Sequence, residues 1–191
     1  MEVSEAIRSR RSVRKYREDR VSREDLKELV DYARLAPSGM NKQPLKFVIV
    51  DEPDLERELF GYTNWAGAVD WNPKPDERPR AYILVLIDSE VQPATENHDA
   101  GLAAGNICLG AVEKGLGSCL LGAIDKNPIK KLLNIPDSLE LDLAIGLGYP
   151  DQEVVLEEET DKIDYSLDEE NGFHVPKKPL DDILHLNGWE G

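Results

Sequence analysis

The chain has 191 residues, and its 40% hydrophobic and 32% charged side chains are typical of a soluble globular protein. Its formal net charge of −15 argues against nucleic acid as a partner, because most of the surface would repel a long polyanion. No apolar run approaches the roughly 20 residues of a membrane span, and the start Met-Glu-Val-Ser-Glu lacks the apolar core of a signal peptide. We therefore expect one domain over residues 1–191, located in the cytoplasm and without a membrane partner.

The first half of the chain predicts mainly helix, interrupted by one strand. Ser22 and Asp25 form a capping box, and apolar residues recur at helical spacing from Leu26 until Pro37 ends the pattern. The short apolar run Phe47–Val50 is typical of a buried strand. The elements expected here are helices over 4–10, 22–36 and 54–60, a strand over 47–50, and an irregular loop over 61–80.

The second half mixes strands with a long, glycine-containing helix. The run Tyr82–Ile87 is the clearest strand of the chain. The predicted helix over 97–115 contains Gly101, Gly105 and Gly110, each of which costs about 1 kcal/mol relative to alanine. Close approach to another backbone, in the core or across a subunit interface, would compensate for that cost. The other expected elements are a helix over 128–133, a strand over 141–147, an exposed acidic stretch over 153–170, and a terminal helix over 179–186.

Seven of the 23 basic side chains lie within residues 8–20. Such a concentration of cations in an acidic chain indicates that a small anion is bound there. Where the first helix gives way to extended chain, Arg10, Ser12 and Arg14 can share one face, and two guanidinium groups with a hydroxyl suit a phosphate. The alternative interpretation is a solvated basic patch that pairs with the acidic surface.

Two further segments offer groups that could contact a ligand. The polar loop over 37–44 lies between a helix end and a strand, where loops often carry function, although turn chemistry alone also explains its residues. The segment over 115–123 is not a dinucleotide fingerprint, because Leu120 stands where the third glycine is needed and the motif follows a helix. Its Gly122 and Ala123 would still leave backbone N–H groups accessible to a flat ligand.

The chain shows no self-sufficient catalytic group. It has no serine-nucleophile motif and no phosphate-binding loop motif, so a cofactor would perform the chemistry of an enzyme. The cysteines are expected to be buried, inert thiols. The cysteines and histidines that match no metal or disulfide spacing are Cys108, Cys119, His98, His174 and His185.

Five segments, taken together and in this order, resemble the nitroreductase family of FMN-dependent oxidoreductases over nearly the whole chain. The segments are 10–14, 36–44 leading into 47–50, 99–106, 115–123, and the tail 176–180 with its second basic island. The resemblance implies an α+β, nitroreductase-like fold with a central, mostly antiparallel sheet surrounded by helices. It also implies an interlocked homodimer with two FMN sites at the interface, and a ping-pong reaction. In that reaction NADH or NADPH reduces the flavin, and a nitroaromatic, quinone or similar small acceptor is then reduced.

The resemblance also gives each segment a role, and no side chain is expected to be catalytic by itself. Arg14 would lie at the pyrimidine edge of the flavin, where a fixed cation raises the reduction potential. The groups expected at the phosphate and ribityl chain are Arg10, Arg11, Ser12, Lys177 and Lys178. Those expected from the opposite subunit are Pro37, Ser38, Gly39, Met40, Asn41 and Gln43. Those expected at the ring are Leu120 and Leu121 on one face, with the Gly122 and Ala123 amides near N5 and the C4 carbonyl.

Other hypotheses stay open at this point. The absence of an acid–base pair is compatible with a non-catalytic module that binds or senses FMN. Flavin-consuming and dehalogenating relatives carry no marker that separates them from this chain. Gly122 stands where some members have an acidic residue, and Asn64 is a weaker candidate for the pyrimidine edge.

Overall fold

The computed structural model describes residues 1–91, 96–158 and 161–189, and for residues 96 and 97 it describes the backbone only. These residues form two compact units, and each is described here by itself. The first unit comprises Met1–Trp65 and Asn72–Asp151, and the second comprises Ala66–Trp71 and Gln152–Gly191.

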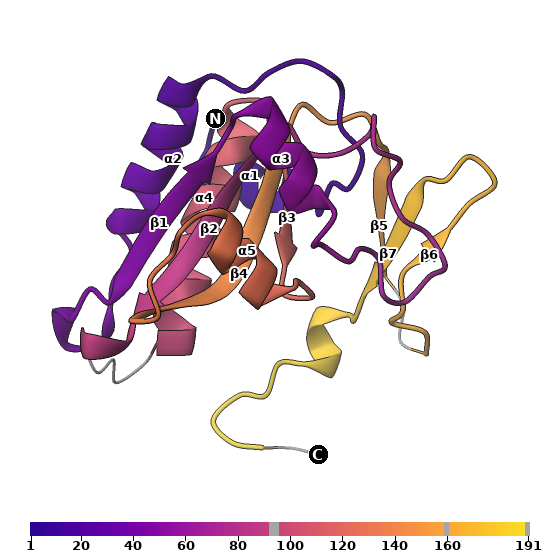
Figure 1. The fold of residues 1–191 in the computed structure, drawn as a ribbon. Helices are drawn as coiled ribbons and strands as arrows, with labels where there is room; N and C mark the ends of the chain where they lie inside the picture. Colours follow the sequence, from indigo (N-terminus) through magenta and orange to yellow (C-terminus); the bar gives the residue numbers. More distant parts are fainter. Residues whose placement is uncertain (92–95, 159–160, 190–191) are drawn as a thin grey trace. The chain divides into compact units, whose positions relative to one another are not determined.

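A four-stranded antiparallel sheet is the centre of the first unit (Figure 1). Its order is β1-β2-β4-β3, and its strands are β1 (Leu45–Val50), β2 (Ala81–Asp88), β3 (Gly117–Leu121) and β4 (Leu139–Gly148). All three pairings are antiparallel. The α+β class with an antiparallel sheet among helices is therefore confirmed. Strand β3 was not among the elements predicted from the sequence.

Five helices surround this sheet. They are α1 (Val3–Ser9), α2 (Arg23–Arg34), α3 (Pro53–Phe60), α4 (Glu96–Glu113) and α5 (Lys126–Leu132). The predicted cap of α2 is confirmed, since the backbone N–H of Asp25 donates to Ser22 Oγ at 3.0 Å. The segment over 61–80 contains no helix or strand, as expected. Short 3₁₀ turns lie at Gly39–Asn41, before β1, and at Ser89–Val91, after β2.

Both faces of the sheet are buried, which explains the unbroken apolar sequence of β2. Ile83 and Val85 face a core formed with α2 and α4, where Leu26, Leu29 and Ile107 have no exposed surface. The alternate residues of β2 point to the other face, over which Figure 1 shows α3 and α5. Each strand end is therefore fixed from two sides, and the loops at those ends are positioned by a rigid core.

The three glycines of α4 have different surroundings. A Cβ built on Gly110 would lie 2.5 Å from the Tyr32 ring, so this glycine permits the close contact between α4 and α2. A Cβ on Gly101 or Gly105 would meet nothing within 4 Å. Packing within the chain thus explains one glycine of the three, and Leu102 between the other two is 49% exposed.

The second unit is built on a three-stranded sheet with the order β5-β7-β6. Its strands are β5 (Val154–Glu158), β6 (Ser166–Leu167) and β7 (Phe173–Lys177), and Trp71 and Tyr165 pack against the buried Phe173 ring. Most of the acidic stretch is exposed as expected, although the sequence did not reveal its strands. The predicted helix over 179–186 is wrong, since the only helical piece there is a 3₁₀ turn at Leu180–Asp182. The apolar side chains of that segment are not buried against another element, and an isolated short helix is marginal in water.

No helix among the described residues is long and apolar enough to cross a membrane.

Candidate functional site

Two inward-facing side chains attach the basic segment to the sheet. Val13 lies against Gly117, where a Cβ would be 2.8 Å from Val13 Cβ, and the Val13 N–H donates to the Ser118 carbonyl oxygen at 2.9 Å. Tyr16 is buried against Gly148, and its hydroxyl lies 2.5 Å from the Val13 carbonyl oxygen and 3.2 Å from that of Gly146. The segment therefore runs beside strand β3, with Ser12 paired in parallel to Ser118.

The anchored backbone leaves three of the predicted phosphate and flavin groups on the outer side. Val13 is buried, whereas Arg10, Ser12 and Arg14 are partly exposed, as are Arg11 and Lys15. Burial raises the pKa of the Cys119 thiol in β3 to about 11, although the guanidinium groups of Arg14 and Arg10 act on it in the opposite direction. Both cations thus lie close enough to β3 to influence its side chains.

Arg11 has a different environment. Its guanidinium Nη1 donates to the carbonyl oxygens of Arg8 and Arg10, each at 2.7 Å. These carbonyls lie at the C-terminal end of α1, where a cation is favourable. Burial and the neighbouring Arg10 lower the pKa of Arg11. In this conformation Arg11 ends the helix and does not join the outer row of Arg10, Ser12 and Arg14.

Other cations of the cluster are engaged in ion pairs. Arg20 Nη1 lies 2.8 Å from Glu56 Oε2, and Glu56 is fully buried on α3. Arg78 Nη2 lies 3.0 Å from the other carboxylate oxygen of Glu56. Burial raises the pKa of Glu56, and the two arginines oppose that shift. Lys15 lies 3.5 Å from Glu77. These pairs fasten the segment to the fold.

The end of β3 presents a leucine and two backbone amides outward. Leu120 is 44% exposed, whereas Leu121 is buried in the core, because neighbouring side chains of a strand point to opposite faces. Of the two leucines expected at the flavin ring, only Leu120 offers its side chain. Gly122 and Ala123 are exposed, and the Ile124 N–H donates to the Gly122 carbonyl oxygen at 3.1 Å in a tight turn.

Residues 62–64 hold this turn in place, a role that the sequence did not reveal. The Asn64 N–H donates to the Ala123 carbonyl oxygen at 2.9 Å, and Asn64 Nδ2 donates to the same atom at 3.4 Å. The Asp125 N–H donates to the Tyr62 carbonyl oxygen at 2.9 Å. Because the Ala123 carbonyl is fixed on one side, the turn presents a defined surface on the other.

The loop over 37–43 is strained and is tied to α4. Met40, Asn41 and Gln43 have φ angles of 51°, 54° and 51°, in the left-handed region that non-glycine residues rarely adopt. The Gly39 N–H donates to Asp99 Oδ1 at 3.0 Å, and the Gln43 N–H donates to Ser38 Oγ at 3.1 Å. Strain of this kind is concentrated at functional sites. Asp99 is buried, and its bond to the Gly39 N–H ties the loop to α4.

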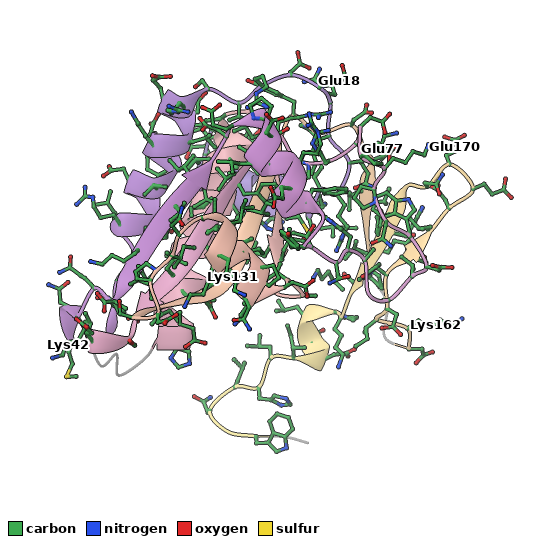
Figure 2. All side chains as sticks on the ribbon, viewed as in Figure 1. Glu18, Lys42, Glu77, Lys131, Lys162 and Glu170 are labelled. Atoms are coloured by element: carbon green, nitrogen blue, oxygen red, sulfur yellow. The ribbon has the colours of Figure 1, made fainter. Side chains whose placement is uncertain are left out.

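The sheet separates this loop from the basic segment. The loop comes directly before β1, and its residue Lys42 is labelled in Figure 2. Residues Arg10–Arg14 run alongside β3, at the opposite edge of the sheet. Two strands lie between those edges, so about 14 Å of sheet divides them at the usual strand spacing. One chain therefore brings together Arg10, Ser12, Arg14, Leu120, Gly122 and Ala123, and it holds Pro37, Ser38, Gly39, Met40, Asn41 and Gln43 apart from them.

The tail lysines belong to the second unit. Lys177 ends β7 and Lys178 follows it, and both side chains are exposed. Pro176 is tolerated in β7 because the short β6 pairs only with Phe173 and His174. The place of the two lysines at a phosphate stays a prediction.

The family model described as Nitroreductase family matches residues 7–149. This chain belongs to that family. A Thermotoga neapolitana protein named iodotyrosine deiodinase is 32% identical over 162 residues, covering 75% of this chain and 86% of that protein. A Methanothermobacter thermautotrophicus protein, described as an NADH dehydrogenase or NAD(P)H nitroreductase, is 30% identical over 78% of each chain.

Solved structures agree with this assignment. A protein from Desulfovibrio desulfuricans, described as a nitroreductase and solved in complex with FMN, is 27% identical and superposes with a TM-score of 0.73. The superposition covers 100% of this chain and 99% of that one. A nitroreductase family protein from Clostridium novyi is 28% identical with a TM-score of 0.68, covering 79% and 86% of the two chains. The nitroreductase-like fold expected from the sequence is thus confirmed.

The two cysteines are free and buried, as expected. Burial raises the pKa of both thiols, so neither is a ready nucleophile. Among the described residues, no group of three or more His, Cys, Asp or Glu side chains could hold a metal ion.

Proposed function

We propose that this protein is an FMN-dependent oxidoreductase that takes electrons from NADH or NADPH and passes them, in a ping-pong reaction, to a nitroaromatic, quinone or similar small acceptor. The observation that carries the proposal is the outer row of Arg10, Ser12 and Arg14 beside the exposed end of β3. These side chains and the exposed strand end together suit a ligand that has a phosphate group and a flat polar ring. Bound FMN would supply the electron transfer.

The residues of the chain would bind and tune that group. Arg10 and Ser12 would bind the ribityl phosphate, with Lys177 and Lys178 adding charge. Arg14 would keep a positive charge at the pyrimidine edge, where reduction adds negative charge. The amides of Gly122 and Ala123 would donate at the N5 and C4 carbonyl edge, and Leu120 would cover one ring face.

Two copies of the chain would complete each site. The strained loop over 37–43 lies across the sheet from the basic segment, so it would reach the flavin of the partner subunit. The unexplained Gly101 and Gly105 and the exposed Leu102 give α4 a small, apolar face that a second copy could cover. Large apolar side chains are also exposed along residues 180–189, where Trp189 is 81% exposed. We infer a homodimer from these faces.

The composite site can be tested with mixed dimers. One subunit would carry Arg10→Ala with Ser12→Ala, and the other Ser38→Ala with Asn41→Ala. Each variant alone should lose FMN from both sites, whereas co-expression should restore FMN to one site of each mixed dimer. An FMN content in the mixed dimer no higher than in either parent would contradict the shared site.

The activity itself is tested in two steps. The purified protein should release FMN on denaturation, and anaerobic mixing with NADH or NADPH should bleach the flavin rapidly, with colour returning when an acceptor is added. A matched pair of variants separates site from surface charge, since Arg10→Ala should lose FMN whereas the neighbouring exposed Arg8→Ala should retain it. A protein that binds FMN but is not bleached would instead be the non-catalytic module.

Reductive dehalogenation is a second candidate, because a relative at 32% identity is named iodotyrosine deiodinase. The same reduced enzyme should be mixed with iodotyrosine and with a nitroaromatic. Iodide release at a rate comparable with nitroaromatic reduction would favour the deiodinase activity.

A further inference from the structure

Two neighbouring polar hollows lie beside helix α5, outside the site described above. The first has a volume of about 560 Å³ and is lined by Asn127, Lys130, Lys131, Asn134, Ile135, Pro136 and Asp137. The second has a volume of about 550 Å³ and is lined by Glu58, Tyr62, Asn127, Pro128, Lys131 and Leu132. Asn127 and Lys131 line both, so the two hollows adjoin at these side chains, and together they are called the α5 depression.

The cations of this depression are mostly not neutralised by the protein. Lys131, labelled in Figure 2, is exposed and has no ion pair within 4.0 Å among the described residues. Lys130 lies 4.0 Å from Asp137, whose carboxylate is fully exposed to solvent. Glu58 is the other acidic side chain that lines the hollows. In a chain with a net charge of −15, ammonium groups left beside a hollow can attract an anion.

The floor of the depression is rigid. The Ile135 N–H donates to the Lys130 carbonyl oxygen at 2.9 Å and the Asn134 N–H to that of Lys131 at 3.3 Å, while Asn134 has a φ of 53°. This is a Schellman-type helix end, which satisfies the last carbonyls of α5. Ile135 and Ile129 are buried beneath it. The lysines therefore extend from a backbone that is fixed without a ligand.

Helix α5 follows the exposed end of β3 after a short turn. Asp125 precedes α5, and its N–H donates to the carbonyl oxygen of Tyr62, whose side chain lines the second hollow. At the helical rise, Lys131 lies about 9 Å along the axis from Asp125. A ligand whose ring stacks beside Gly122 and Ala123 could therefore extend along α5 and place phosphates at the lysines.

We propose that the depression along α5 binds the adenosine diphosphate half of the dinucleotide reductant, with its pyrophosphate on Lys130 and Lys131 and its adenine beside Tyr62. The inference rests on the proposed function, because it names the place of that function's reductant. Ammonium groups bind phosphate as point charges, and the half-buried Tyr62 ring offers a stacking surface.

The test compares Lys130→Gln/Lys131→Gln with the control Lys27→Gln/Lys74→Gln, which removes the same charge from exposed positions away from α5. Titration of the purified protein with ADP-ribose, followed by calorimetry, measures binding in the depression without any redox step. Removal of two exposed charge-assisted contacts should weaken ADP-ribose binding about tenfold, while the control should change it less than twofold. Equal affinities in the two variants, or no binding by the unchanged protein, would overturn the inference.

A second measurement separates this inference from the proposed function. Flavin bleaching by NADH should need about tenfold more reductant in the α5 variant, at an unchanged limiting rate. Bleaching by 1-benzyl-1,4-dihydronicotinamide, which has no phosphates, should be unaffected. If both reductants bleach the variant as they bleach the unchanged protein, the hollow is not the dinucleotide site and the proposed function stands. If neither reductant bleaches the unchanged protein, the proposed function fails, and the ADP-ribose titration still decides the hollow.

Discussion

Val13 lies so close to Gly117 that a Cβ on the glycine would be 2.8–2.9 Å from three atoms of the valine. This contact sets the position of the basic segment, since it holds the chain between Ser12 and Arg14 against β3. The glycine is thus part of the site without touching a ligand.

Gly117→Ala should therefore destabilise the protein by about 1–3 kcal/mol, as expected for an overpacked contact, and should weaken FMN retention. Urea unfolding and the FMN content after dialysis measure the two effects. Gly67→Ala is the control, because a Cβ there meets nothing within 4 Å. In a Val13→Gly background, which lacks all three contacting atoms, Gly117→Ala should cost less, and an unchanged cost would show that the contact is not the cause.

Arg10 and Arg14 should respond differently to truncation, although they lie on the same outer row. Arg10→Ala should weaken FMN binding about 10- to 100-fold, the usual range for a lost charged hydrogen bond. Arg14→Ala should lower the reduction potential by about 20–60 mV, or about 1–3 kcal/mol for a two-electron couple, because the reduced flavin loses a neighbouring positive charge. Fluorescence titration and spectroelectrochemistry measure these quantities. Equal losses of affinity with no change of potential would refute the assigned roles.

Asp99 should contribute to stability through the Gly39 N–H. Asp99→Ala leaves the partly buried Gly39 N–H without its acceptor, so the free energy of unfolding should fall by about 1 kcal/mol. Asp99→Asn keeps an acceptor oxygen and should recover much of the loss. A loss below about 0.5 kcal/mol for the alanine variant would mean that the strained loop holds its conformation without this bond.

Local patterns predicted the elements whose signals are themselves local. The capping box of Ser22 identified α2, and the apolar run around Ile83 identified β2. Strand β3 escaped because Gly117 is a glycine for a long-range reason, the approach of Val13. The terminal helix was wrong because apolar spacing at Leu180 and Ile183 does not form a helix without a packing partner.

The candidate site was likewise predictable only where its signals are local. The burial of Val13 and Tyr16 follows from the residues themselves, since they are the only large apolar side chains of the segment. The hydrogen bonds of Arg11 to the end of α1 are local, but no sequence pattern distinguishes them, and the ion pair of Arg20 with Glu56 depends on a tertiary contact. The sequence cannot distinguish such paired cations from those left for a ligand.

His174 should titrate above its ordinary pKa of about 6.5. Its Nδ1 lies 2.6 Å from Glu157 Oε1 and its Nε2 lies 3.3 Å from Asp168 Oδ2, so hydrogen bonds to Glu157 and then Asp168 raise the pKa of the imidazole. The protonated form can donate to both carboxylates at once. A raised pKa means that this stabilisation is present in full below the ordinary pKa and is lost as pH rises through the folded value.

An NMR titration of the His174 ring protons measures this pKa directly. Asp168→Asn and Glu157→Gln should each lower it, whereas Glu169→Gln, a nearby exposed acid, should leave it nearly unchanged. A His174 pKa at or below about 6.5 in the unchanged protein would show that the two carboxylates do not act on the ring.

Substitutions at Gly101 test whether the α4 face around Gly101 and Gly105 is covered by a second copy of the chain. A Cβ at either position meets nothing within the chain, so Gly101→Ala should stabilise a monomer by about 0.5–1 kcal/mol through helix propensity. In a dimer packed on this face, the larger Gly101→Leu should separate the subunits, because close packing tolerates little added volume. Sedimentation velocity should then show a monomer for Gly101→Leu and a dimer for Gly67→Leu. Since the shared site needs the partner's loop, the Gly101→Leu monomer should also lose FMN, whereas a variant that stays dimeric and gains stability would place this face in solvent.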